Sequence, residues 1–138
     1  MKEKIYLASR YGRRDELCQY RSQLELLGHP VTSRWLNGNH QIDDNGLAAE
    51  GTKTERERFA QEDWDDLMAA DWVFSFTEKP RTSTNSRGGR HVEFGAALAA
   101  GKRCAVIGWR ENVFHCMPQV AFFDTWEGLM ERLLPTSP

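Results

Sequence analysis

Short apolar runs alternate with amphipathic segments along this sequence, and their order constrains the fold more than any other feature. The apolar runs predict strands at 4–9, 30–36, 71–76, 103–109 and 120–124. Apolar residues at helical spacing predict helices over 13–29, 54–70, 88–101 and 125–134. Strict alternation implies βαβ crossovers. We therefore expect an α/β fold, a flavodoxin-like or Rossmann-like three-layer sandwich with a mostly parallel sheet of about five strands.

The bulk properties narrow the class of protein. A chain of 138 residues predicts one domain spanning 1–138. Its 18 basic and 20 acidic residues, with net charge −2, argue against a nucleic acid polymer as partner. No apolar run approaches the roughly 20 residues that cross a bilayer, and the N-terminus lacks a signal peptide's apolar region, so we expect no membrane association. Cys18, Cys104 and Cys116 form no CxxC motif and predict reduced thiols in a cytoplasmic protein.

The predicted parallel sheet also locates a candidate site. Ligands of such sheets bind beyond the carboxyl ends of the strands. The segments that directly follow predicted strands are 9–13, 34–40, 77–93 and 108–115. All four are rich in polar and aromatic residues, so functional residues are expected there.

The third of these segments leads into the helical stretch "GGRHVEFGAALAAGK" at 88–102. Gly88 and Gly89 allow close approach of a ligand to the free N–H groups of a helix start. Glu93 lies about a turn and a half into the helix, among small residues and near the strand ends. A surface glutamate stabilised by the helix dipole explains the same pattern, so spacing alone does not assign Glu93 a function.

A second carboxylate near Glu93 would indicate chemistry. Asp71 opens a predicted strand and Asp63 lies eight residues earlier on the preceding helix, although a local cap or pair also explains an aspartate at a strand start. Two carboxyl groups around a glycosidic bond are the minimum apparatus for substitution at an anomeric carbon. Tyr6 can orient a carboxylate and Tyr11 can stack on a flat ligand, or both can simply pack in the core or at its rim.

Other binding motifs are weak. The sequence has no Walker loop and no GxGxxG. His40 with Asp43 and Asp44 matches no established metal pattern, so no metal site is expected. The basic loop "SRYGRR" at 9–14 can meet a phosphate, although a solvated charged face also explains it.

Four segments taken together, "IYLAS", "DWDDLMAADWVFSF", "GGRHVEFGAALAAGK" and "RENVFH", resemble the nucleoside 2-deoxyribosyltransferase family. The resemblance runs from about residue 4 to residue 126, and the related deoxynucleoside 5′-monophosphate N-glycosidases share that fold. It implies that Glu93 is the nucleophile that bonds to C1′ of the sugar, and that Tyr6 hydrogen-bonds to it. It further implies that Asp71 contacts the base and helps its protonation. It implies as well that Asp63 has a supporting role and that Tyr11 lines the base pocket.

The resemblance also implies a homo-oligomer, at least a dimer. Asn112, in "RENVFH", matches an asparagine that reaches into a neighbouring subunit's site and holds the 5′ end of the sugar. One departure concerns Arg87, six residues before Glu93, where the transferases often carry Asp and the nucleotide hydrolases Ser. Arg87 and Arg90 can accommodate a 5′-phosphate, which leaves nucleoside and nucleotide substrates both open.

Residues and resemblance together predict a nucleoside 2′-deoxyribosyltransferase. It exchanges nucleobases on nucleosides through a covalent glycosyl-Glu93 intermediate, with side hydrolysis. Its partners are small-molecule nucleosides and nucleobases, held in part by Arg87, Gly88 and Gly89. No metal or organic cofactor is expected, because the carboxylates supply the chemistry. The alternatives are a nucleoside 5′-monophosphate N-glycosidase and a nucleotide-sensing module without turnover.

Overall fold

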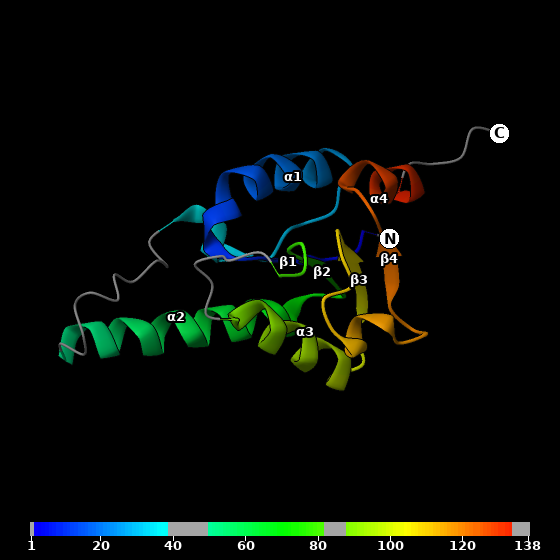
Figure 1. Ribbon diagram of the computed structural model, residues 1–138. Helices are drawn as coiled ribbons and strands as arrows, with labels where there is room; N and C mark the ends of the chain where they lie inside the picture. The colour runs from blue at the N-terminus through cyan, green and yellow to red at the C-terminus, as the bar shows by residue number, and fades with distance from the viewer. Residues whose placement is uncertain (1, 39–49, 82–87, 134–138) are drawn as a thin grey trace.

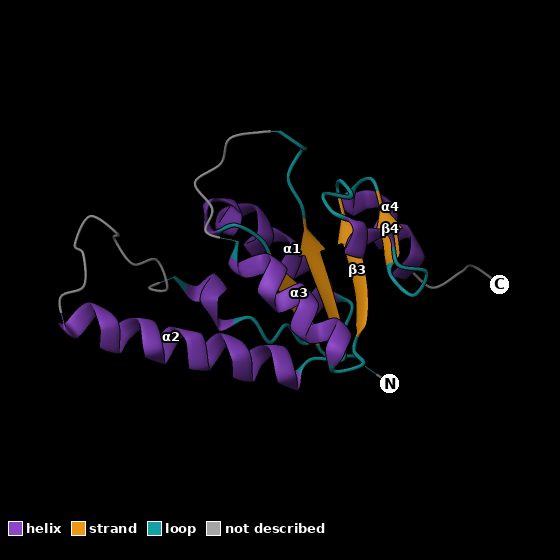
Figure 2. Cartoon of the chain, turned by 60° about the horizontal axis from the view of Figure 1, so that its bottom comes forward, coloured by secondary structure: helices purple, strands orange, loops and turns teal. Residues whose placement is uncertain are grey.

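The computed structural model describes residues 2–38, 50–81 and 88–133, and it confirms a three-layer α/β architecture (Figure 1). One face of the sheet is covered by α1 (Arg14–Leu26) and α4 (Trp126–Leu133). The other face is covered by α2 (Glu50–Ala69) and α3 (Gly89–Ala99). Figure 2 shows α2 and α3 side by side on that second face.

The sheet consists of β1 (Ile5–Ala8), β2 (Trp72–Phe76), β3 (Arg103–Ile107) and β4 (Ala121–Phe123). They lie in that order, and every pairing is parallel. The four correspond to strands predicted from the sequence. Because all of them run the same way, their carboxyl ends meet at one edge of the sheet, and their amino ends meet at the other.

The sheet therefore has four strands rather than five, and the strand predicted at 30–36 is the one that is missing. Within this segment, the pairing with β1 is limited to a single parallel bridge between Val31 and Ile5. The chain then turns into a 3₁₀ helix at Arg34–Asn37, which buries two large apolar side chains of this segment. The segment still lies beside β1, where a fifth strand would pair.

Side chains replace the backbone pairing that this segment lacks. The Leu7 N–H donates to Ser33 Oγ at 2.7 Å, and the Trp35 indole N–H donates to the Leu7 carbonyl at 2.9 Å. Both backbone groups of Leu7 are thus satisfied without a strand. A run of β-rich residues predicts a strand, but it does not distinguish strand pairing from this side-chain substitute.

The core lies on both faces of the sheet. All of β1 is buried, as are the last four residues of β2 and of β3. This is the pattern of a parallel sheet covered by helices. The helices add buried side chains to this core, among them Leu17 and Leu24 of α1 and Phe94 and Ala97 of α3. Among the described residues, no helix is both long enough and apolar enough to cross a membrane.

Candidate active site

The site is built where α3 begins, at the carboxyl edge of the sheet. Gly88 precedes α3 with φ of 82°, in the left-handed region, and its carbonyl accepts the His91 N–H at 3.0 Å. A side chain added at Gly88 or Gly89 would meet no atom within 4 Å. The conformation, rather than crowding, therefore favours glycine at Gly88. The described residues thus leave an opening beside the backbone of these two glycines.

Glu93 and Tyr6 meet below this opening. Tyr6 is completely buried in β1, and its hydroxyl donates a hydrogen bond to Glu93 Oε2 on α3. The half-buried position of Glu93 raises the pKa of its carboxyl to about 8, although the Tyr6 hydrogen bond acts in the opposite direction. Burial and the Glu93 charge raise the pKa of Tyr6 well above its usual value, so Tyr6 remains a proton donor in this bond.

Asp63 is the second carboxylate at this place. It lies on α2, and its negative charge raises the pKa of both Glu93 and Tyr6. A like charge acts this way only from nearby. The structure thus brings together three of the residues selected from the sequence, which come from β1, α2 and α3.

Asp71 does not belong to this group, which corrects its predicted role at the leaving base. It directly precedes β2 and therefore lies at the amino edge of the sheet, opposite the start of α3. Its side chain is exposed, and its Oδ2 accepts the Lys4 N–H at 2.8 Å. Its own N–H donates to the Lys4 carbonyl at 2.8 Å. Asp71 ties the beginnings of β1 and β2 together.

Tyr11 lies at the carboxyl edge, in the 3₁₀ helix Tyr11–Arg13 that follows β1. Its ring is partly exposed and lies 6.0 Å from that of Trp35, tilted by 46°. The position fits an aromatic wall of the opening. Contact with a base stays a prediction.

The basic loop after β1 is already paired. Glu78, which follows β2, accepts hydrogen bonds from Arg10 Nε at 3.0 Å and from Arg13 Nη1 at 3.1 Å. Arg13 also binds Glu16 of α1, with Nη2 and Oε2 2.7 Å apart. Guanidinium groups that are already paired with carboxylates are poor sites for an additional phosphate. The ion pairs of this loop instead connect β1, β2 and α1.

A buried ion pair at the start of α3 was not recognised from the sequence. Arg90 is 6% exposed, and its guanidinium donates to both carboxylate oxygens of Glu111, which follows β3. Arg90 therefore does not offer a free charge to a 5′-phosphate, contrary to one sequence-based suggestion. An acidic residue in the loop after the neighbouring strand was the available signal for this pair.

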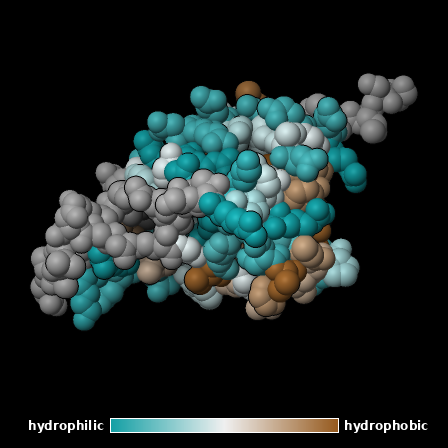
Figure 3. All heavy atoms as spheres, in the orientation of Figure 1, coloured by the Kyte–Doolittle hydropathy of each residue, from teal (hydrophilic) through white to brown (hydrophobic). Residues whose placement is uncertain are grey.

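Asn112 is exposed, and its Oδ1 accepts the Phe114 N–H at 3.0 Å, which caps the 3₁₀ helix at Val113–Cys116. Val113 is 76% exposed and Phe114 is 61% exposed. In Figure 3 apolar side chains gather at the bottom of the molecule, over this 3₁₀ helix and α3. A role of Asn112 in a neighbouring subunit stays a prediction.

Several sequence-selected residues lie outside the described ranges, namely Arg87, His40, Asp43 and Asp44. Within 2–38, 50–81 and 88–133, no three His, Cys, Asp or Glu side chains are arranged to hold a metal ion.

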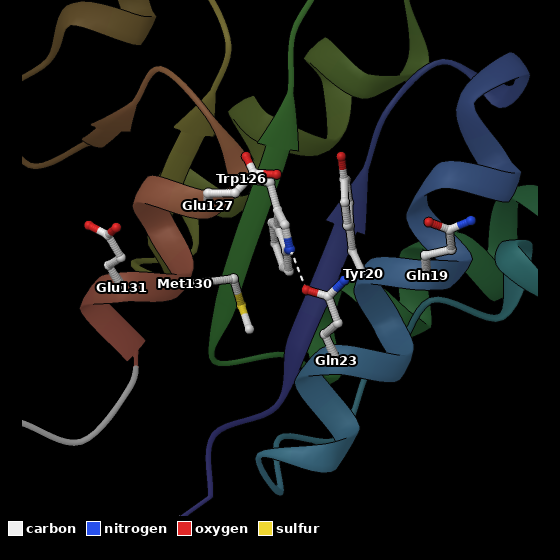
Figure 4. Close-up of a pocket in the computed structure, with 7 residues that line it drawn as sticks. All are labelled: Gln19, Tyr20, Gln23, Trp126, Glu127, Met130 and Glu131. Atoms are coloured by element: carbon white, nitrogen blue, oxygen red, sulfur yellow. Dashed lines mark hydrogen bonds between the residues drawn. The ribbon is translucent and has the colours of Figure 1, made fainter.

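A hollow lies on the face of the sheet opposite Glu93, between α1 and α4 (Figure 4). The Tyr20 and Trp126 rings stack there with centroids 4.3 Å apart, and the Trp126 indole N–H donates to Gln23 Oε1 at 2.8 Å. The ring faces and the indole donor are thus already used, and the sheet separates this hollow from Glu93. We assign it no part in the chemistry.

No protein-family model and no curated protein sequence matches the chain. Solved structures do match. A 2-deoxyribosyltransferase from Bacillus psychrosaccharolyticus superposes with a TM-score of 0.67 at 22% identity, over 98% of each chain. The CMP N-glycosidase BcmB of Clostridium botulinum superposes with a TM-score of 0.57 at 15% identity, over 95% of this chain and 98% of the other.

The chain has their fold. A conserved protein from Enterococcus faecalis V583 shares it too, with a TM-score of 0.60 at 14% identity, over 96% of this chain and 99% of that one. The architecture expected from the sequence is thereby confirmed, with four strands. Two of the three proteins are named for the transfer or hydrolysis of a glycosidic bond. That chemistry is what a pair of carboxylates can perform.

Proposed function

We propose that the protein is a nucleoside 2′-deoxyribosyltransferase with Glu93 as its nucleophile. The observation that carries the proposal is the Tyr6–Glu93 hydrogen bond beside Asp63, at the carboxyl edge of the sheet. It unites an oriented nucleophile and a second carboxylate below an open helix start. The fold shared with a 2-deoxyribosyltransferase supports the same reaction.

The reaction is a double displacement at C1′. A Glu93 carboxylate oxygen attacks C1′ while the bond from C1′ to the base nitrogen breaks and its electron pair leaves with the base. The two carboxyls hold one proton between them, which lies on Asp63 when Glu93 attacks as a carboxylate, and Asp63 passes it directly or through a water to the departing base. A second base then attacks C1′ through a ring nitrogen, gives the proton of that nitrogen to Asp63 and releases the Glu93 carboxylate, which returns a nucleoside with the original anomeric configuration. Water in place of the second base gives hydrolysis.

Tyr6 has a positioning role in this scheme. Its hydroxyl holds one oxygen of Glu93, which leaves the other to attack. The raised pKa of Glu93 makes the carboxylate more basic than an exposed glutamate, and hence a better nucleophile once ionised. The attacking form therefore becomes more abundant as the pH rises toward about 8.

A base-exchange assay tests the proposal. The protein is mixed with deoxyinosine and free adenine, and the products are separated by chromatography. Deoxyadenosine appearing with hypoxanthine is the expected result. If hypoxanthine and free deoxyribose are the only products, the enzyme is a hydrolase and not a transferase. The absence of any reaction with deoxynucleosides would overturn the proposal.

A 5′-monophosphate N-glycosidase is the second candidate, because the chain shares its fold with a CMP N-glycosidase. The paired state of Arg10, Arg13 and Arg90 argues against a 5′-phosphate site built on these three residues. Release of free base from CMP or dCMP, with no reaction of the nucleosides, would favour this candidate.

We also propose that the active unit is at least a dimer in which Asn112 acts in the neighbouring subunit's site. The exposed Val113 and Phe114 beside Asn112 support a contact at this place. Mixing Glu93→Ala chains with Asn112→Ala chains tests it. Each mixed dimer contains one site with both residues intact, so partial recovery of activity is expected. Two inactive variants that stay inactive when mixed, or a monomeric active protein, would contradict it.

A further inference from the structure

Arg90 and Glu93 both lie on α3, three residues apart, yet they do not pair with each other. Residues at this spacing are neighbours on a helix surface and commonly form ion pairs. Here Tyr6 binds Glu93, whereas Glu111 binds Arg90. Arg90 is also not among the groups that shift the pKa of Glu93. The separate partners of the two side chains therefore keep the Arg90 guanidinium away from the Glu93 carboxyl.

Glu111 and Arg90 form a bidentate ion pair. Arg90 Nη2 donates to Glu111 Oε1 at 3.0 Å, and Nη1 donates to Oε2, so both ends of the guanidinium face are held. Glu111 Oε2 also accepts the Glu78 N–H at 3.0 Å, which fixes the carboxylate itself. A bidentate pair of this kind is both strong and directional.

The other charged and titratable groups around this pair do not displace it. His91 Nε2 lies 4.0 Å from Glu111 Oε1, and the buried His115 accepts the Glu111 N–H through Nδ1 at 2.9 Å. Burial lowers the pKa of both histidines, and the Arg90 charge lowers them further. Both imidazoles therefore stay neutral and leave Glu111 to Arg90. The Glu78 carboxylate is occupied by the arginines of the loop after β1.

We infer that Glu111 is a positioning residue that diverts the Arg90 guanidinium from Glu93 and so keeps the nucleophile free. Among the described residues, the groups that act on the charge of Glu93 are then Tyr6 from β1 and Asp63 from α2. If Arg90 were released, its guanidinium would stabilise the Glu93 carboxylate and occupy its oxygens. The importance of this for turnover rests on the proposed function, but the pairing itself does not.

The test begins with Glu111→Gln, which keeps the size and one carbonyl acceptor but removes the charge. We expect kcat/KM at pH 9, where Glu93 is mostly ionised in both proteins, to fall about tenfold or more because the released guanidinium occupies the Glu93 oxygens. The acidic limb of the pH profile should move to lower pH, because an opposite charge lowers a carboxyl pKa by about 1–3 units. The double variant Arg90→Met with Glu111→Gln lacks the guanidinium and should recover most of the loss. If the pair served only to hold α3 in place, the double variant would be no better than the single one, and the inference would fail.

Two further variants serve as controls. Glu111→Asp keeps the charge with a shorter reach and should show a smaller fall in the same direction. Glu3→Gln removes an ion pair with Arg103 at the amino edge of the sheet and should leave the pH profile unchanged. A shifted profile in Glu3→Gln would mean that general loss of charge, rather than release of Arg90, causes the effect.

A second measurement does not require turnover. Thermal unfolding of chains with and without Glu93→Gln is compared across pH 5 to 9, once in the natural background and once in the Glu111→Gln background. We expect the substitution to stabilise the natural chain increasingly toward pH 8, and to lose this benefit in the second background, where Glu93 gains Arg90 as a partner. An unchanged benefit would overturn the inference even in an active enzyme. A natural chain that turns over no nucleoside would instead refute the proposed function alone.

Discussion

The two edges of the sheet use the same residue types for opposite purposes. At the amino edge, Asp71 binds the Lys4 backbone, and Lys102 Nζ donates to the Met68 and Ala70 carbonyls at 2.8 and 2.7 Å. Both of these charged groups are satisfied by backbone groups. At the carboxyl edge, Asp63 and Glu93 are placed close enough for their charges to oppose each other. Opposed carboxylates with a raised pKa are candidates for chemistry, and we propose that role for Asp63 and Glu93.

The largest contrast between the edges is expected in turnover. Glu93→Ala removes the proposed nucleophile and should reduce kcat by more than about a thousandfold. Asp71→Ala, at the other edge, should change kcat by less than about threefold and cost about 1 kcal/mol of stability for its lost hydrogen bond. Base-exchange rates and thermal unfolding of both variants give the comparison. Equal losses of activity would remove the distinction between the edges.

A smaller effect is expected for the second carboxylate. Asp63→Asn should lower kcat about 100-fold, the lower range for loss of a general acid. The loss should be smallest with bases that leave readily without protonation, and a substrate series measures this dependence. Uniform losses across the series would assign Asp63 a structural role instead.

Tyr6→Phe should have a milder effect that depends on pH. The hydroxyl lowers the pKa of Glu93, so its removal should raise that pKa and move the acidic limb of kcat/KM to higher pH. Activity at pH 7 should fall about tenfold and recover partly at pH 9. A loss of the same size at every pH would contradict the assigned hydrogen bond.

The smallest expected effect is on stability. The Glu93 carboxyl has a pKa of about 8 in the folded protein, above the 4.5 of an exposed glutamate. The folded state therefore holds a proton that the unfolded state releases, and stability falls as the pH rises from about 4.5 to about 8. Glu93→Gln abolishes this term, so its melting temperature should exceed that of the natural chain near pH 8 but not near pH 4. A constant difference would show that Glu93 does not titrate in this range.

The sequence located most of the fold because its periodicity records burial directly. The helices, four of the five predicted strands and their alternation follow from it, whereas the pairing of Tyr6 with Glu93 was implied by the family resemblance. The choice between Asp71 and Asp63 required geometry instead. α2 runs antiparallel to β2, and Asp63 lies six residues before its end, so it stands about 9 Å back from the amino edge. The helical rise alone would have favoured Asp63.

What the sequence could not reveal depends on side chains that act on distant backbone or on one another. The segment at 30–36 has the composition of a strand, but Ser33 and Trp35 bind Leu7 through their side chains. Arg90 reads as a free cation at a helix start, and only the position of the loop after β3 shows that Glu111 holds it. Both cases join segments that are far apart in the chain.

The side-chain contacts to Leu7 also protect the β1 border of the sheet from pairing with a further strand. A strand at the border of a sheet normally presents unpaired N–H and C=O groups on which a foreign strand can assemble. Along β1, Pro30 accepts the Ile5 N–H, Thr32 donates to the Ile5 carbonyl, and Ser33 and Trp35 occupy both groups of Leu7. The backbone groups of Ile5 and Leu7 are therefore not available to an incoming strand. The strand that carries Tyr6 is thus protected from intermolecular pairing although no fifth strand among the described residues covers it.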